Sequence, residues 1–419
     1  MRRIEIEAIG NLAGETLAAS CGLVQEMHEA IAQRPFEILG TAAAPVRVVH
    51  DGITRGVYRA VRLGLRVVPR EAAGLAALSA GDTGPPLAAT PAGSVTLAAL
   101  NGLYGDHLAG RGNRLALAME LRGGGAAVPV TPAGLASAFP DATSRIAVFV
   151  HGLCETDEAW RQFPLGGDRG GRRTYGERLR DELGFTPVHV RYNSGLRISR
   201  NGRALALLLD ELVEGWPTNV AEVVLVGHSM GGLVARSACH YAAQDERRWA
   251  DATRHVFCLG APHLGTHLEK GLNVISWALG RVPETRAWSS LINARSVGIK
   301  DLRFGACVDE DWRDSDPDEF LRDRCHEVPF LPDAHYYFVA ASVREGALGS
   351  LVGDVLVRIP SASGRGNGKG RRIPFVLDNG LELSGLNHFD LLNHPAVYEQ
   401  IRTWVSRAQA NHQLPASAG

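Results

Sequence analysis

The sequence predicts an α/β fold with a mainly parallel sheet and helices on both of its faces. From about residue 115 onward, short apolar runs rich in β-branched residues alternate with segments of helical apolar spacing. Strands that are buried on both faces have such continuous apolar runs, and the helices that connect parallel strands cover the two faces. Hydrophobic residues make up 45% of the 419 residues, which is enough for a sizeable core.

The individual elements follow from the same patterns. LALAMELRGGGAAVPV (115–130) predicts two strands joined by a glycine turn. The further expected strands are 145–152, 186–193, 223–229, 255–265, 335–342 and 373–377. The expected helices between and after them are 201–216, 231–244 and 394–408.

Residues 1–112 differ from the rest, because helical spacing recurs around 13–32, 46–68 and 94–108 with a Gly/Pro-rich loop at 81–93. We expect a helical N-terminal extension that covers the core. The alternative is that this extension forms a lid or a membrane-facing surface, since basic and apolar residues alternate in the segment 55–66. The core is expected at 113–265 and 335–410, and 411–419 as a flexible tail. The interval 266–334 is too long for an ordinary connection and predicts an inserted cap.

Composition and charge narrow the function classes. The 44 basic and 45 acidic residues nearly cancel, so bulk charge does not support nucleic-acid binding. No segment is long and apolar enough to predict a membrane span, and Glu5, Glu7 and Glu15 interrupt any signal-peptide core. We expect a cytoplasmic protein, with peripheral membrane contact as the alternative. The oligomeric state is left open.

The six cysteines lack the spacing of a zinc site. We therefore expect reduced, partly buried thiols and no metal. The alternative concerns Cys307 and Cys325, which lie in one irregular segment and would pair in an oxidising compartment.

The stretch AEVVLVGHSMGGLVA (221–235) carries the main chemical signal. Gly227, Ser229 and Gly231 fit Gly-x-Ser-x-Gly with a strand before and a helix after, the context of a nucleophilic serine on a sharp turn. Glycines on both sides let the strand and the helix approach without Cβ clashes. The N-terminus of the following helix favours developing negative charge. The competing interpretation is a structural turn.

A serine nucleophile needs a base, and in this arrangement the chain order is Ser, acid, His. His388 lies in GLNHFDLLNHP (385–395), between the expected last strand at 373–377 and the last helix. We predict His388 as the base. His394 is the competitor, but it directly precedes Pro395 and is typical of a helix start.

The acid is expected in the loop after the strand at 335–342. Asp354, beside Gly353, is the predicted residue, because a loop aspartate there can accept the Nδ1–H of the histidine and fix its tautomer. Asp378 and Asp390 are the alternatives. Asp378 is too close to the expected last strand, and Asp390 is expected to support the histidine loop.

An oxyanion hole completes the expected site. One donor is the backbone N–H of Met230, directly after the serine. The second is the N–H of Leu153, since Gly152 lets the loop turn after the strand at 145–150. His151 is expected to orient this loop rather than to act as a base.

Five motifs occur in the order VFVHGL, VGHSMGG, GAPHLGT, GDVLV with PSASG, and NHFDLL. Over about residues 115–408 the chain resembles the α/β-hydrolase superfamily on its lipase/esterase side, near bacterial triacylglycerol lipases and PGAP1-like (GPI inositol-deacylase-like) proteins. The resemblance implies the same triad and oxyanion donors. In some lipases of this type an aspartate two residues after the catalytic histidine binds calcium. Asp390 holds that position, but no second acidic ligand is identified.

These observations predict a serine carboxylic-ester hydrolase that needs no cofactor and acts on an apolar or lipid-like ester through an acyl-enzyme. The alternatives are an acyltransferase or thioesterase with the same triad, which differ in the acceptor or the leaving group, and a non-catalytic binding protein with the same fold.

Overall fold

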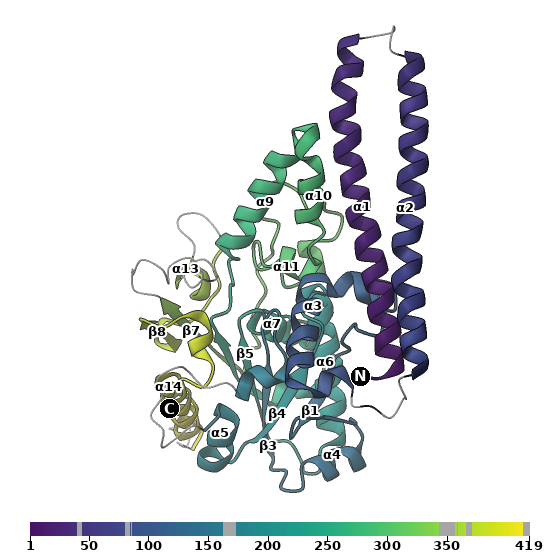
Figure 1. Ribbon diagram of the computed structural model, residues 1–419. Coiled ribbons are helices and arrows are strands. Elements are labelled where there is room, and N and C mark those ends of the chain that lie inside the picture. Colours follow the sequence, from purple (N-terminus) through teal and green to yellow (C-terminus); the bar gives the residue numbers. More distant parts are fainter. Residues whose placement is uncertain are drawn as a thin grey trace. The chain divides into compact units, whose positions relative to one another are not determined.

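The computed structural model describes residues 1–39, 44–79, 84, 86–161, 173–342, 357, 359–365 and 371–413. Within them, eight strands form one sheet in the order β2-β1-β4-β3-β5-β6-β7-β8 (Figure 1). β1 pairs antiparallel with β2 and β4, and all other neighbours are parallel. The strands are β1 (Glu120–Gly123), β2 (Ala126–Val128), β3 (Arg145–Val150), β4 (Thr186–Arg191), β5 (Glu222–His228), β6 (Thr253–Leu259), β7 (His335–Ser342) and β8 (Gly380–Ser384).

Helices cover both faces of the sheet, as predicted, because alternate side chains of each central strand enter two different cores. Val148 of β3 packs in a cluster with residues of α6 and α7, whereas its neighbour Phe149 packs in a cluster with residues of α5 and α14. The helices that follow the first strand pair include α4 (Pro132–Ala138), α5 (Tyr175–Leu183), α6 (Ile198–Gly215), α7 (Met230–Gln244), α8 (Arg248–Ala252) and α14 (Pro395–Gln413).

The predicted last strand is wrong. The strand is β8 at Gly380–Ser384, not 373–377. Pro374 has no N–H to donate to a neighbouring strand. Gly380 is suited to pair with β7, because a Cβ there would lie 2.2 Å from Cζ of Phe338. Asp378 therefore precedes the last strand, in the 3₁₀ turn η6 (Leu377–Asn379).

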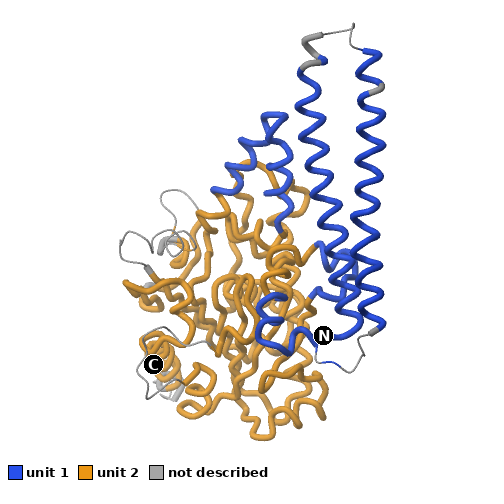
Figure 2. Tube along the Cα trace, viewed as in Figure 1, with its two compact units in different colours: residues 1–97, 107–116, 271–295 blue, residues 98–106, 117–270, 296–419 orange. Residues whose placement is uncertain are grey.

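The chain divides into two compact units (Figure 2). Unit 1 contains residues 1–97, 107–116 and 271–295, and unit 2 contains 98–106, 117–270 and 296–419. The two units do not coincide with the predicted extension (1–112) and cap (266–334). Part of α3 (Pro91–Gly110), which lies in the predicted extension, belongs to unit 2, and part of the predicted cap belongs to unit 1.

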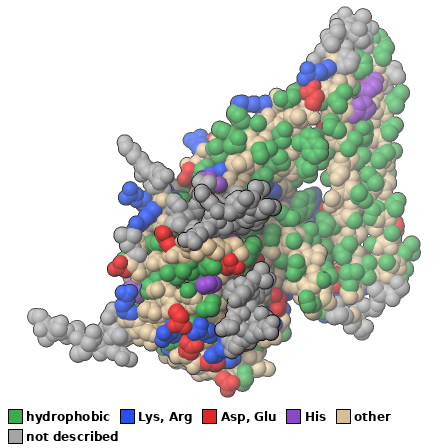
Figure 3. All heavy atoms as spheres, turned by 60° about the vertical axis from the view of Figure 1, so that its left-hand side comes forward, with side chains coloured by type: hydrophobic (Ala, Val, Ile, Leu, Met, Phe, Trp, Pro, Cys, Tyr) green, Lys and Arg blue, Asp and Glu red, His purple; other side chains and the backbone are tan. Residues whose placement is uncertain are grey.

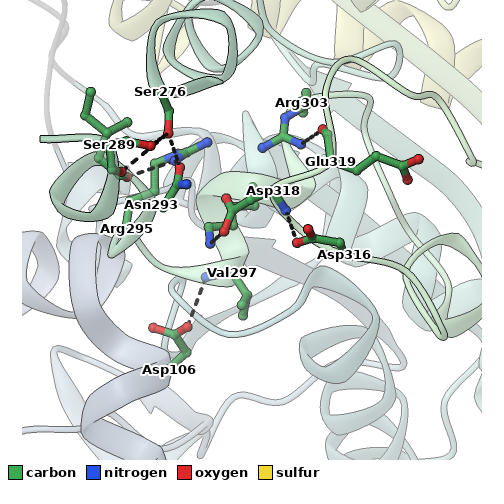
Figure 4. A network of polar contacts seen from close by, with 12 residues as sticks. Asp106, Ser276, Ser289, Asn293, Arg295, Val297, Arg303, Asp316, Asp318 and Glu319 are labelled. Carbon is green, nitrogen blue, oxygen red and sulfur yellow. Dashed lines mark hydrogen bonds and ion pairs between the residues drawn. The ribbon is translucent and has the colours of Figure 1, made fainter. Parts of the chain in front are cut away.

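In unit 1, α1 (Arg3–Leu39) and α2 (Ala44–Ser79) form a long antiparallel hairpin (Figure 1). Glycine permits their close approach, since a Cβ on Gly10 would lie 2.1 Å from Cβ of Ala73. α10 (Arg286–Asn293) also belongs to this unit. The Ser276 hydroxyl, on α9 (His267–Gly280), donates to Oδ1 of Asn293 at 2.6 Å (Figure 4).

In unit 2, residues 98–106 of α3 pack against the loops that follow β3 and β4. A Cβ on Gly102 would lie 2.3 Å from Sγ of Cys154, and the carbonyl of Gly105 accepts from Nδ2 of Asn193 at 2.9 Å. The N–H of Val297 donates to Oδ2 of Asp106 at 3.1 Å (Figure 4). The short elements that complete the fold are η2 (Leu87–Ala89), η3 (Asp157–Arg161), η4 (Pro283–Thr285), α11 (Val297–Asp301), η5 (Asp309–Asp311), α13 (Ile359–Ala362) and η7 (His388–Leu391).

All six cysteines are described, and each is a free thiol, Cys307 and Cys325 included. No helix among the described residues combines the length and the apolar character that a membrane crossing requires.

Candidate active site

Ser229 occupies a sharp turn between β5 and α7. Its backbone has φ 53° and ψ −123°, a conformation that is unusual for a residue other than glycine. A Cβ on Gly227 would lie 2.5 Å from the backbone nitrogen of Gly232, and one on Gly231 would lie 2.2 Å from the carbonyl oxygen of Val150. Glycine is therefore required on both sides of the serine, as the motif predicts.

His388 lies at the same end of the sheet as Ser229. The N–H of Ser229 donates to the carbonyl of Leu259 at 2.8 Å, and the next residue, Gly260, is covered by the His388 ring. A Cβ on Gly260 would lie 2.9 Å from Cε1 of that ring. Among the described residues no hydrogen bond joins the Ser229 hydroxyl to His388. Such bonds are often long before substrate binds.

The His388 imidazole is buried and neutral near pH 7. Burial, followed by the positive charge of His228, lowers the pKa of His388 to about 3, and the Glu155 carboxylate opposes this in part. A neutral imidazole can accept a proton, so the protonation state suits a general base.

The alternative residues for base and acid have structural partners. Nδ1 of His394 accepts from the N–H of Ala396 at 3.2 Å and so caps the start of α14, as its sequence position predicts. Oδ2 of Asp390 accepts from the N–H of Asn387 at 2.8 Å and supports the loop that carries His388. Asp354, the predicted acid, lies outside the described residues.

The loop after β3 is held so that one N–H stays available. The N–H of Tyr192 donates to Nε2 of His151 at 3.2 Å, so the proton is on Nδ1, which donates to the carbonyl of Gly152 at 2.9 Å. The N–H of Gly152 donates to Oε2 of Glu155 at 2.7 Å. His151 thus orients the loop, as expected.

The predicted oxyanion donors are the N–H groups of Leu153, in the loop after β3, and of Met230, the first residue of α7. In the described part of the chain neither of their N–H groups has an acceptor. The loop also passes close to the serine, since a Cβ on Gly152 would lie 3.0 Å from Cβ of Ser229. Both N–H groups remain available to an oxyanion.

A buried pair that the sequence analysis missed, Glu155 and His228, connects the loop after β3 to the loop that carries His388. Nδ1 of His228 lies 3.0 Å from Oε1 of Glu155, and its Nε2 donates to the carbonyl oxygen of His388 at 3.2 Å. The exposed fractions of the two side chains are 0% for His228 and 9% for Glu155. Glu155 therefore binds both the loop after β3 and His228, and His228 binds the loop of the predicted base.

The pair is an ion pair near neutral pH. Burial opposes the charge of both groups, but attraction and hydrogen bonding outweigh it, so the pKa of Glu155 is lowered and that of His228 is raised. The sequence carries a weak signal for this pair, because His228 is the variable residue inside Gly-x-Ser-x-Gly and Glu155 follows Gly152 by three positions. Their proximity is a property of the fold, since 73 residues separate them.

Among the described residues, no cluster of three or more His, Cys, Asp or Glu side chains is arranged to hold a metal ion.

Residues 203–317 match the sequence model of a family described as the PGAP1-like alpha/beta domain. The match includes Ser229 and its elbow, but Gly152 and His388 lie outside it. The mostly parallel sheet with helices on both faces, and Ser229 on a sharp turn between a strand and a helix, are features of the α/β-hydrolase fold.

Solved structures of lipases and esterases are similar to parts of the chain. The mature lipase BlEst2 of Bacillus licheniformis is 19% identical with a TM-score of 0.40, and the match covers 62% of this chain and 91% of that one. The naproxen esterase (carboxylesterase NP) of Bacillus subtilis is 12% identical with a TM-score of 0.32, covering 63% and 87%. No curated protein matches the chain.

Proposed function

We propose that this chain is a serine hydrolase that cleaves carboxylic esters of apolar or lipid-like substrates. The observation that carries the proposal is Ser229 on a strained turn, with the neutral ring of His388 against Gly260 beside it and two unused N–H groups nearby. A strained serine is retained when its hydroxyl must be presented to a substrate.

In the first half-reaction, the Ser229 oxygen attacks the ester carbonyl carbon while His388 takes the hydroxyl proton. The N–H groups of Leu153 and Met230 hold the resulting oxyanion. The carbon–oxygen bond to the alcohol then breaks, and His388 gives its proton to the leaving oxygen. In the second half-reaction, water attacks the acyl-enzyme with His388 again as base, and the acid and free Ser229 are released.

Two further roles complete the proposal. Asp354 accepts the Nδ1–H of His388 and stabilises the imidazolium. Glu155 and His228 position the oxyanion loop and the loop of the base, and they do not touch the reacting atoms.

The test is hydrolysis of a p-nitrophenyl ester series, from acetate to palmitate. We expect turnover by the wild type and a loss of at least about 10⁴-fold in kcat for Ser229→Ala. The matched control is Ser406→Ala, at an exposed position of α14, which should retain full activity. If the folded wild type hydrolyses no ester of the series, or if Ser229→Ala retains its turnover, the proposal fails. An added alcohol acceptor separates hydrolysis from acyl transfer through the products.

A further inference from the structure

Residues 98–106 of α3 are packed into unit 2, unlike the two long helices that precede them in the chain. Figure 3 shows hydrophobic side chains gathered along α1 and α2 on the face in view, and the exposed fraction reaches 71% for Val48 of α2. Within 98–106 only Leu103 is exposed, and Asn101 is fully buried. This part of the predicted N-terminal extension is therefore an integral part of unit 2.

Two glycines form the surface of α3 that meets the loops after β3 and β4. Gly102 and Gly105 lie three residues apart and so on one side of the helix. A Cβ on Gly102 would lie 2.3 Å from Sγ and 2.9 Å from the backbone nitrogen of Cys154. A Cβ on Gly105 would lie 1.9 Å from Oδ1 of Asn193. No larger residue fits at either position without a shift, so the backbone of the helix itself contacts both loops.

Hydrogen bonds join these two loops to each other and to α3. The N–H of Cys154 donates to Oγ of Ser194 at 3.1 Å, which connects the loop after β3 to the loop after β4. Nδ2 of Asn193 donates to the carbonyl oxygen of Gly105 at 2.9 Å. The loop after β3 is therefore held by a hydrogen bond to its neighbour and by close packing on α3.

The same turn of α3 is anchored by the segment that leads into α11. The Ser296 hydroxyl donates to the carbonyl oxygen of Gly102 at 2.6 Å, and the Ser296 N–H donates to that of Leu103 at 2.9 Å. The N–H of Val297 donates to Oδ2 of Asp106 at 3.1 Å (Figure 4). Because these hydrogen bonds fix the helix, α3 is a firm support for the loop after β3.

Cys154 is held in a conformation that few residues other than glycine adopt. Its φ is 58°, in the left-handed region, and such a conformation persists only where the surroundings impose it. Burial, with a smaller contribution from the Glu155 carboxylate, raises the pKa of its thiol to about 11. The thiol therefore stays protonated and is a packing group, for which Gly102 leaves room.

The peptide groups on both sides of the Leu153 N–H are held by hydrogen bonds. The N–H of Gly152 donates to Oε2 of Glu155 at 2.7 Å, and the N–H of Cys154 donates to Oγ of Ser194 at 3.1 Å. The direction of the N–H between them depends on both contacts. Glu155 supplies the first restraint, and the loop after β4 together with α3 supplies the second.

We propose that α3 positions the predicted oxyanion donor. Gly102 and Ser194 hold Cys154 in place, and Cys154 in turn fixes the N–H of Leu153 in the direction that binds the oxyanion. This inference rests on the proposed function. Gly102 and Ser194 are positioning residues, because both act through Cys154 and not on the substrate. The segment 98–106 then contributes to catalysis and is more than a cover over the core.

The test is steady-state hydrolysis of the best p-nitrophenyl ester by Gly102→Ala. The added methyl group meets the backbone of Cys154 as well as its thiol, so the loop must move, and a displacement of about 1 Å costs roughly 100-fold in rate. We expect kcat to fall about 100-fold while KM changes less than about threefold, because the N–H of Leu153 acts on the transition state. Circular dichroism and urea unfolding establish that the variant is folded.

The matched control is Gly110→Ala on the same helix. A Cβ there would meet no other part of the described chain within 4 Å, so this variant should keep the kcat of the wild type.

Removal of the thiol separates a displaced loop from a general loss of stability. In Gly102→Ala/Cys154→Ala the contact at 2.3 Å is gone and the contact with the backbone nitrogen remains. The kcat of this double variant should therefore recover about tenfold relative to Gly102→Ala. Ser194→Ala removes only the acceptor of the Cys154 N–H and should lower kcat about tenfold. Ser194→Ala carries the test if Gly102→Ala does not fold.

The inference is overturned if folded Gly102→Ala and Ser194→Ala both keep kcat within about twofold of the wild type, or if the loss appears in KM instead of kcat. In both cases Ser229-dependent turnover by the wild type leaves the proposed function intact. A wild type that hydrolyses no ester of the series overturns the proposed function and this inference with it.

Discussion

Removal of the Glu155 carboxylate tests whether the buried ion pair positions the site. The side chain makes two contacts, with the N–H of Gly152 at 2.7 Å and with Nδ1 of His228 at 3.0 Å. Glu155→Ala breaks both, whereas Glu155→Gln keeps an acceptor for Gly152 and loses only the charge. The two variants therefore separate the ion pair from the support of the oxyanion loop.

The magnitudes follow from burial. Breaking a buried ion pair by removing one partner costs about 3–5 kcal/mol. Without Glu155, burial favours the neutral form of the His228 ring. Because the ring can lose its charge in this way, Glu155→Ala should lower the free energy of unfolding by about 3 kcal/mol, at the low end of that range. Loss of a charge-assisted hydrogen bond alone lowers the free energy of unfolding by about 1–2 kcal/mol in the glutamine variant.

The catalytic effect is expected to be larger for alanine. Under the proposed mechanism the N–H of Leu153 binds the oxyanion, so once Gly152 loses its acceptor this donor is no longer held in place, and a displacement of about 1 Å costs roughly 10²-fold in rate. We expect kcat to fall about 100-fold in Glu155→Ala with a small change in KM. Glu155→Gln should remain within about tenfold of the wild type.

The assay is steady-state hydrolysis of the best p-nitrophenyl ester, together with urea unfolding of each variant. Glu158→Ala is the control, because Glu158 forms a surface pair with Arg161 and is 40% exposed. Its expected effect on stability is below about 1 kcal/mol. If folded Glu155→Ala keeps kcat within twofold of the wild type, the positioning role is refuted.

Three further predictions concern the base, the acid and the turn. Because the pKa of His388 is lowered, the acid limb of the kcat/KM profile should lie below pH 6.5, and His228→Gln should move it to higher pH by removing a nearby positive charge. Asp354→Asn should lower kcat by about 10⁴-fold while the circular dichroism spectrum stays unchanged, and an undiminished rate would exclude this acid. Gly227→Ala should lower the free energy of unfolding by about 3 kcal/mol in urea titrations, because its Cβ meets the backbone. Gly56→Ala, with no atom within 4 Å, should raise it by about 0.5–1 kcal/mol.

Much of the fold could be predicted because it depends on residues that are close together in the sequence. The apolar runs of β3 and β5 and the glycines around Ser229 report constraints that act within a few residues, so the central strands and the elbow could be predicted. The structural roles of His394, the competitor for the base, and of Asp390, an alternative acid, could be predicted for the same reason, since each has its structural partner within three residues.

The errors and omissions concern contacts that only the fold creates. Residues 373–377 have a strand-like composition, but the pairing with β7 is decided by the space beside Phe338, which Gly380 fits. Likewise, the sequence carries only a weak signal for the buried pair of Glu155 and His228, because 73 residues separate the two. Asp354 stays a prediction, because it lies outside the described residues.

The most direct test of the central claim is covalent labelling of the folded protein with an alkyl p-nitrophenyl phosphonate, followed by peptide mapping. The account predicts one adduct per chain, located on Ser229, with loss of ester hydrolysis in proportion to labelling and much slower labelling in His388→Ala. A folded protein that forms no adduct, or that is labelled at another residue while Ser229 stays unmodified, would contradict it.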